Sequence, residues 1–419
     1  MVLPYYRKSF TNASYNGEIC LSLLDWISAF ALVLCPILQH YRGVFVEAGT
    51  EILILVFPYT LLKMLCIKKF YMKPVIPLAL YGIFISIIHG FSVFTFSREL
   101  LLLFYFVAVL NKGIDIKKYY VIAKTISICA AWLIMLQYLL YYGFHFHLQL
   151  VPVGRLLDSA SQWIGLATTG RISVTGTWMS IYRPSAFFLE PSHLSIFCTP
   201  VLVLNLLSGD TGRKEIRESV LVSVGMILST SGIGIAIVAG AWILYAMFYY
   251  STDDNTEQGV KKHTIRFNTL LFLLTFAVVF GLLYGMVGIF RSSVNRIFFS
   301  TGSGSNAIQG RTATGIRLLR LLSGSNLLFG RGNTLRISNW NVSGFFYIVF
   351  QFGWIGALLF YWFYVKSLFW LKKKYFWLTL IVVLLSFFTV HTFAAFYRMF
   401  FVCMVLRGYL TKQHDPSSL

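Results

Sequence analysis

The stretch SVLVSVGMILSTSGIGIAIVAGAWILYAMFYY, Ser219–Tyr250, decides how many times this chain crosses a membrane. It is apolar almost throughout, and a membrane-spanning helix needs about 20 mostly apolar residues. The stretch is therefore either one long helix or two short helices that turn at Ser229-Thr230-Ser231-Gly232. The two alternatives give the rest of the chain opposite orientations, so this stretch fixes the topology.

The composition of the whole chain predicts an all-α polytopic membrane protein. Of its 419 residues, 57% are hydrophobic and only 12% are charged, whereas soluble domains carry about 25% charged residues. We expect one transmembrane domain over residues 1–419. The first twenty residues are polar and aromatic, so no cleavable signal peptide is expected.

Twelve apolar runs are expected to be membrane-spanning helices, with an uncertainty of one or two because several are short. They are 21–38, 47–66, 74–96, 98–111, 119–143, 193–208, 219–231, 232–250, 267–290, 341–365, 376–395 and 399–410.

Lysine placement favours two helices in the deciding stretch. Lysines cluster at 63–73, 112–124, 214, 261–262, 366–374 and 412. With twelve spans and a cytoplasmic N-terminus, all of these clusters lie at or near the cytoplasmic side, as the positive-inside rule requires. A single helix would instead place Lys372, Lys373 and Lys374 outside.

Two large loops, at about 144–192 and 291–340, are expected outside, yet both carry positive charge against the positive-inside rule. All of this charge comes from arginine. The two loops contain no lysine and ten arginines. The arginines are Arg155, Arg171 and Arg183 in the first loop, and Arg291, Arg296, Arg311, Arg317, Arg320, Arg331 and Arg336 in the second. Arginine grips phosphate with a planar, bidentate fork, so the loops predict a phosphate or pyrophosphate site. The alternatives are arginines that snorkel to lipid headgroups and a wrong topology.

No nucleic-acid partner, metal or cofactor is expected. The net charge of +20 is spread over short clusters between apolar runs, which is typical of topology signals. The six cysteines form no CxxC pair, so neither a metal site nor a disulfide framework is indicated. His145 and His147 stand at the end of a span and are interpreted as interfacial residues. Asp158 and Glu190 are the only carboxylates of the two loops.

The first loop ends in YRPSAFFLEPSHLSIF, Tyr182–Phe197. Before this segment, the loop is expected to form a lid of short amphipathic pieces around Trp163 and Trp178. Pro191 predicts the start of a helix, and Glu190 just ahead of it is either a capping residue or a general base. His193 is the alternative base, since ionisable residues at the mouth of a membrane helix are functional by default.

The second loop contains GRTATGIRLLRLLSGSNLLFGRGN, Gly310–Asn333. Arg317 and Arg320 are three residues apart and lie on one face of a predicted interfacial amphipathic helix. The glycine-rich turn FGRGN, Phe329–Asn333, is expected to present backbone N–H groups and Arg331 to a phosphate.

These two loops carry a family resemblance. Arg183 followed by Phe188-Leu189-Glu190-Pro191 resembles the signature of Wzy-type polymerases of bacterial polysaccharide repeat units, which ends in Phe-x-Glu-Pro. Gly310-Arg311, LFGRGN and SGFFYIVFQFGWIGALLFY (Ser343–Tyr361) are similar to a later block of that family, and LSTSGIGIAIVAG (Leu228–Gly240) to its central hairpin. The order matches over residues 183–360.

The resemblance implies a polymerase and ligase architecture like that of GT-C glycosyltransferases, in the bacterial inner membrane, with the active site facing the periplasm. Such enzymes join oligosaccharide units carried on undecaprenyl pyrophosphate, which serves as donor and acceptor carrier, and use no metal or other cofactor. The implied partners are this lipid-linked glycan, membrane lipid and a chain-length regulator. Glu190 and His193 are the expected catalytic residues. The expected pyrophosphate-binding residues are Arg171, Arg183, Arg311, Arg317, Arg320 and Arg331.

Three rival functions remain. An O-antigen ligase of the same superfamily carries an important histidine in its second large loop, and residues 291–340 contain none. A lipid-linked oligosaccharide flippase or other transporter places polar groups near the bilayer midplane, where this chain has few. A non-enzymatic export or scaffold protein would not explain why the two loops contain arginine but no lysine.

Overall fold

The computed structural model describes the chain in segments. These are residues 6–66, 72–73, 75–90, 93–111, 113–157, 171–173, 180–207, 212–249, 267–286, 288, 290–291, 294–295, 307–332 and 344–369. The two last expected spans, 376–395 and 399–410, lie outside these residues, as do Trp163, Trp178 and Asp158 of the expected lid.

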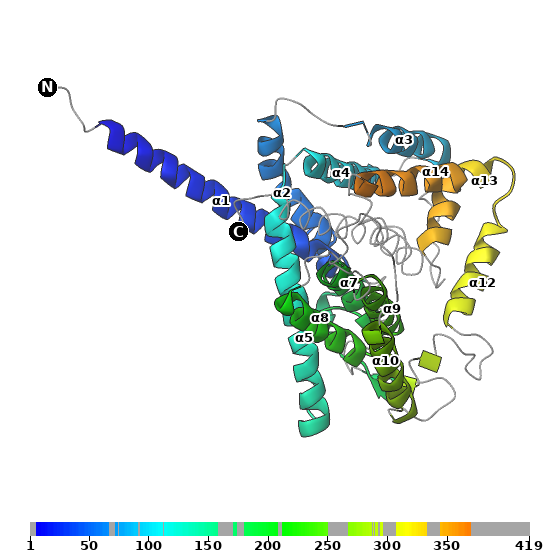
Figure 1. Ribbon diagram of the computed structural model, residues 1–419. Coiled ribbons are helices and arrows are strands. Elements are labelled where there is room, and N and C mark those ends of the chain that lie inside the picture. Colours follow the sequence, from blue (N-terminus) through cyan, green and yellow to red (C-terminus); the bar gives the residue numbers. More distant parts are fainter. Residues whose placement is uncertain are drawn as a thin grey trace, which may run out of the picture.

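The described chain is helical, apart from one short ribbon of two strands (Figure 1). The helices are α1 (Tyr6–Leu38), α2 (Ala48–Leu65), α3 (Ile76–His89), α4 (Val93–Leu110), α5 (Ile116–Phe144), α7 (Pro191–Leu207), α8 (Arg213–Leu228), α9 (Gly232–Tyr249), α10 (Phe267–Met286), α12 (Ala307–Leu319), α13 (Ser325–Phe329) and α14 (Gly344–Phe369). A 3-10 turn, η1, covers Val153–Arg155, and the antiparallel strands are β1 (Arg171–Ser173) and β2 (Ser180–Tyr182).

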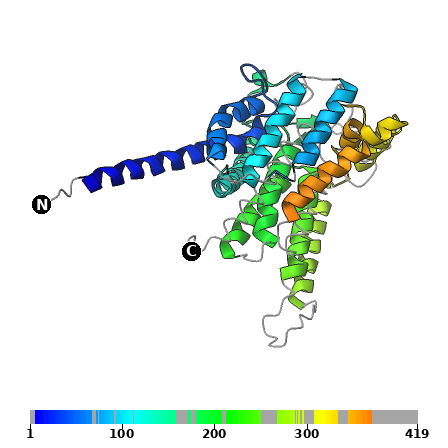
Figure 2. The ribbon, with the colours of Figure 1, turned by 90° about the horizontal axis from the view of Figure 1, so that it is seen from above.

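Three helices of the described part are long and apolar enough to cross a membrane, namely Ala48–Leu65, Ile116–Phe144 and Gly344–Phe363. Shorter apolar helices include Ser22–Leu38, Ile76–His89, Pro191–Leu207 and Gly232–Met247. The protein is therefore a helical membrane protein. Helix α1 begins at Tyr6, well before the expected span at residue 21, and its first half projects away from the other helices (Figures 1 and 2).

The described part of the deciding stretch, residues 219–249, forms two helices, as the lysine placement predicts. Helix α8 ends at Leu228 and α9 begins at Gly232, and between them Thr230 adopts a positive φ of 54°. The hydroxyl of Ser229 donates to the carbonyl of Met226 at 2.7 Å, and the hydroxyl of Ser231 accepts from the N–H of Gly234 at 3.3 Å. Hydroxyl side chains thus satisfy backbone groups that the turn releases.

Helix α7 lies at the centre of the chain's packing. It contacts α5, α8 and α9, and every residue from Leu194 to Leu206 is buried. Its neighbours approach closely through small residues, since a Cβ at Gly234 of α9 would lie 2.5 Å from Oγ of Ser195. Small residues at such contacts are typical of packed membrane helices.

Helix α14 was expected as one span over 341–365, and the structure breaks it at Gly353. This residue has φ 67° and ψ −177°, a backbone region that is essentially restricted to glycine. The break leaves carbonyl groups without helical partners. The N–H groups of Arg331 and Gly332 donate to the carbonyls of Phe350 and Gln351, both at 2.9 Å, and the Tyr81 hydroxyl donates to the carbonyl of Phe352.

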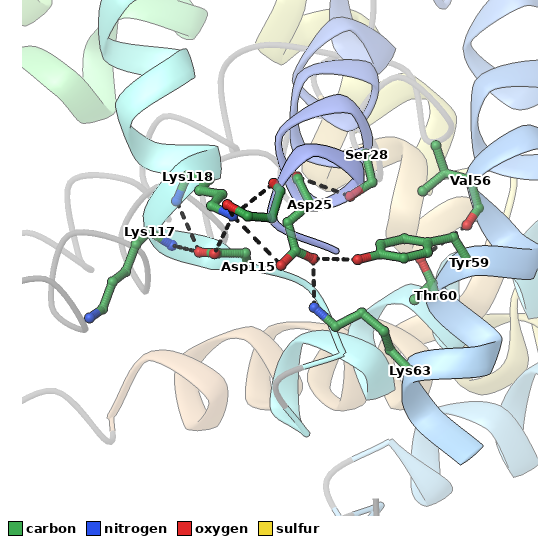
Figure 3. A network of polar contacts seen from close by, with 10 residues as sticks. Asp25, Ser28, Val56, Tyr59, Thr60, Lys63, Asp115, Lys117 and Lys118 are labelled. Carbon is green, nitrogen blue, oxygen red and sulfur yellow. Dashed lines mark hydrogen bonds and ion pairs between the residues drawn. The ribbon is translucent and has the colours of Figure 1, made fainter. Parts of the chain in front are cut away.

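A network of polar side chains joins α1, α2 and α5 (Figure 3). The carboxylate of Asp25 accepts from Lys63 at 2.6 Å and from the hydroxyl of Tyr59 at 2.8 Å. Lys118 lies 3.7 Å from Asp25 and 3.5 Å from Asp115, which caps the start of α5. Lys63 and Lys118 were both expected on the cytoplasmic side, and they meet on the same carboxylate.

Candidate functional site

The segment Arg183–Glu190 is packed into the protein rather than lying on its surface. Ala186, Phe188 and Leu189 are at most 2% exposed. The side-chain oxygen of Gln137 in α5 accepts from the N–H of Ala186 at 2.9 Å, while its nitrogen donates to the carbonyl of Leu148. Because Gln137 is itself buried, this amide fixes the end of the first loop against α5.

Pro191 begins α7, as the sequence predicts. The carbonyl of Glu190 accepts from the N–H groups of His193 and Leu194, so Glu190 occupies the capping position with its backbone. Its carboxylate lies 3.8 Å from Nε2 of His193. These two side chains are 21% and 10% exposed, which makes them a half-buried acid and imidazole pair at the start of a buried helix.

The sequence reasoning missed a third member of this site, His40. This residue belongs to the turn between α1 and α2, and its ring stacks on that of His193 with centroids 4.9 Å apart and an interplanar angle of 16°. We call His40, Glu190 and His193 the histidine cluster. No local motif surrounds His40. Its place in the site could be predicted only from information that links segments distant in the sequence.

The first loop holds the turn that carries His40. The N–H of Leu157 donates to the carbonyl of His40 at 3.0 Å, and the N–H of Arg42 donates to the carbonyl of Arg155 at 2.7 Å. Tyr41 pairs with Leu156 across an isolated bridge and packs with Leu189, next to Glu190. Two segments that were expected on the same side of the membrane thus form one support for the cluster.

The short ribbon brings the backbone of Arg171 close to that of Arg183. Arg171 pairs with Tyr182 in the register of β1 and β2, which places its backbone beside the residue that precedes Arg183. Arg183 is only 8% exposed. Burial of a guanidinium is costly unless acceptors or an anion lie beside it.

Two tyrosines beside the site remain protonated over the neutral range. Burial raises the pKa of Tyr182 to about 12, and its ring stacks on Tyr141 at a centroid distance of 3.8 Å. Burial also raises the pKa of Tyr41 to about 12. The hydroxyls of Tyr41 and Tyr182 are buried without a hydrogen-bond partner among the described residues.

Arg311, Arg317, Arg320 and Arg331 of the second loop belong to another packing unit, in which α12 and α13 lie on α14. Arg311 is part of α12. Arg317 and Arg320 are exposed, while Leu318 and Leu322 are 1% and 7% exposed. Helix α12 ends at Leu319, so Arg320 lies just beyond it, and Ile316 and Leu321 are exposed together with the two arginines.

The FGRGN turn does not present its first N–H groups to a phosphate. The N–H of Gly330 donates to the carbonyl of Asn326, and those of Arg331 and Gly332 donate to α14. The expectation that these N–H groups bind a phosphate is therefore wrong, because those of Arg331 and Gly332 donate to carbonyls that the break at Gly353 leaves without helical partners. The Arg331 side chain donates to the carbonyl of Leu321 at 2.8 Å, and its Nε is buried without a partner in the described part of the chain.

The described residues include no group of three or more His, Cys, Asp or Glu side chains that could hold a metal ion. What the site offers chemically is a carboxylate and an imidazole for proton transfer; the buried Arg183 precedes them in the same segment.

The fold and the site define a helical membrane protein with a cluster of ionisable residues where a buried helix begins. No protein-family model matches the chain, no curated protein matches its sequence, and no solved structure matches its fold.

Proposed function

We propose that this protein is a Wzy-type polymerase that joins undecaprenyl-pyrophosphate-linked oligosaccharide units into a polysaccharide. The proposal places it in the bacterial inner membrane, with about twelve spans, a GT-C-like architecture and the histidine cluster facing the periplasm. The observation that carries it is the Glu190–His193 pair at 3.8 Å, which follows the buried Arg183 in the order of the family signature.

In the proposed reaction, a hydroxyl at the non-reducing end of the incoming unit attacks the anomeric carbon of the growing chain. The bond between that carbon and the pyrophosphate oxygen breaks, and undecaprenyl pyrophosphate leaves. The proton of the attacking hydroxyl passes to Glu190 or His193. Arginines stabilise the negative charge that develops on the departing pyrophosphate.

The charges of the site support this reaction. Pyrophosphate is already a good leaving group, so a base and positive charge suffice. Arg183 is the arginine nearest in sequence to the pair and is 8% exposed, and the backbone of Arg171 pairs with the neighbouring Tyr182 in the ribbon. Arg311, Arg317, Arg320 and Arg331 lie on the α12–α13 unit, which we propose supplies further charge to the carrier.

The test uses purified protein in nanodiscs with a synthetic undecaprenyl-pyrophosphate-linked repeat unit. A ladder of products that remain on the carrier supports the polymerase. Transfer of a single unit to a different acceptor would indicate a ligase, and transport without a new glycosidic bond would indicate a flippase. Arg311→Lys keeps the charge but loses the bidentate fork, and we expect it to abolish the ladder at a normal protein level.

In a strain that lacks the gene, the carrier should bear single repeat units. Long chains in that strain would overturn the proposal. The orientation is tested separately with single cysteines placed in 291–340, which should react with an impermeant reagent in intact cells. Labelling only after permeabilisation would place this loop inside.

A further inference from the structure

The stacked ring of His40 points to a role that the motif residues alone do not provide. His193 lies in α7, while His40 lies in the turn after α1, and the two rings are nearly parallel at 16°. The Nε2 atom of His193 is 3.8 Å from the carboxylate of Glu190. His193 therefore has one neighbour at its face and another at its edge.

A ring against the face of an imidazole limits how that imidazole turns. The last torsion of a histidine side chain is broad, so packing decides which edge points where. Aromatic rings at this separation prefer such stacked arrangements. His193 is 10% exposed at its side chain, so little room remains for another orientation once His40 is in place.

The position of His40 is itself fixed by the backbone. Its carbonyl accepts from Leu157 at 3.0 Å, and the neighbouring Tyr41 is 4% exposed against Leu189. The turn is thus held to the first loop on one side and to the residue before Glu190 on the other. A ring on such a support is suited to orienting its neighbour.

We propose that His40 is a positioning residue whose ring holds the imidazole plane of His193 so that Nε2 faces Glu190. The effect on rate rests on the proposed function, whereas the orientation of His193 does not. The separation of 3.8 Å exceeds a hydrogen bond, and such pairs are often long in the unliganded state and tighten when substrate binds. His40 keeps them aligned for that step.

The experiment compares His40→Ala with His40→Phe in full-length protein in nanodiscs. Phe keeps a flat ring but has no nitrogen, so it separates the effect of the ring from that of proton transfer. His145→Asn is the matched control, because His145 is exposed at the end of α5 and Asn tolerates its left-handed conformation. The unfolding temperature of each variant is measured first.

The first readout is the rate at which diethyl pyrocarbonate modifies His193, followed by peptide mass spectrometry. We expect His40→Ala to raise this rate about tenfold, because an imidazole that is free to turn exposes the ring nitrogen that the reagent acylates, and His40→Phe to leave it as in the wild type. The rate at His147 in the same samples should stay constant, which separates local opening from unfolding. An unchanged rate in His40→Ala overturns the inference.

The second readout is the rate of joining two lipid-linked units over a range of substrate concentrations, which gives kcat and KM separately. We expect a loss of about 100-fold in kcat for His40→Ala with KM retained, as for other small misplacements of a catalytic group, and recovery in His40→Phe. A loss in His40→Phe equal to that in His40→Ala would show that a nitrogen of His40 acts, and would overturn the positioning role. If the wild type joins no units while the labelling result holds, the proposed function fails and the orientation of His193 stands.

Discussion

The rings of His40 and His193 stack at a centroid distance of 4.9 Å, which joins the turn after α1 to the first turn of α7. The contact brings an imidazole from outside both large loops to the pair formed by Glu190 and His193. The site is thus assembled from the α1–α2 turn, the start of the first loop and its end.

Glu190 provides the most direct test of the chemistry. Glu190→Gln keeps the size of the side chain and removes its charge, so we expect polymer formation to fall about 100-fold or more. The carboxylate does not accept a hydrogen bond from the N–H groups of α7. We therefore expect the unfolding temperature of Glu190→Gln to equal that of the wild type. Polymer length and protein level are measured together, with His145→Asn as control. Wild-type polymer from Glu190→Gln would remove this residue from catalysis.

Tyr41 tests an unpartnered hydroxyl and its pH dependence. The raised pKa of about 12 means that the folded state keeps the phenol proton more tightly than the unfolded state, whose pKa is about 10. The wild type should therefore lose stability relative to Tyr41→Phe as the pH rises from about 10 to 12. Thermal unfolding of both proteins across this range measures the difference.

At neutral pH the same substitution removes a buried hydroxyl that has no partner among the described residues. We expect Tyr41→Phe to be as stable as the wild type or more stable. A clear loss of stability at pH 7 would mean that the hydroxyl is hydrogen-bonded in the folded protein.

Gly353 determines the break in α14. A Cβ there would lie 2.0 Å from the carbonyl oxygen of Leu328, and its backbone region costs other residues about 1–3 kcal/mol. Gly353→Ala should lower the unfolding temperature and the yield of folded protein. The control is Gly281→Ala in α10, where a Cβ meets nothing within 4 Å and alanine favours a helix. Equal stability of the two variants would contradict the kink.

Lys124 and Glu218 form an ion pair at 2.6 Å between α5 and α8, and Asn205 donates to the same carboxylate. Lys124→Met leaves that carboxylate without its cation. We expect a loss of about 2–3 kcal/mol, because the side chains are 20% and 15% exposed and fully buried pairs lose about 3–5 kcal/mol. The double variant with Glu218→Met should recover most of this loss in thermal unfolding, and no recovery would contradict the pairing.

Asp25 tests the network between α1, α2 and α5. Asp25→Asn removes the charge that Lys63 and Lys118 share and should destabilise the protein by about 1–3 kcal/mol. Asp115→Asn is the matched comparison, since Asn caps a helix about as well as Asp and only one ion pair is lost. A denaturant or thermal series should rank Asp25→Asn as the more damaging variant. The reverse order would show that the cap outweighs the network.

The sequence by itself determined where helices form and where some of them end. Apolar length placed α2, α5, α9 and α10, Pro191 placed the start of α7, and the lysine pattern required the break between Leu228 and Gly232. Hydropathy and proline geometry are local, because they act over one helix or its flanking turn, whereas the break between Leu228 and Gly232 follows from lysines spread along the chain.

Only the tertiary structure decided how the site is built. The stack of His40 on His193, the burial of Arg183 and the use of the Arg331 and Gly332 N–H groups at the break in α14 all join segments that are distant in sequence. No periodicity records such contacts. They arise because a broken helix must satisfy its freed carbonyls and a buried polar side chain must find partners, and the packing of the whole chain determines which groups are within reach.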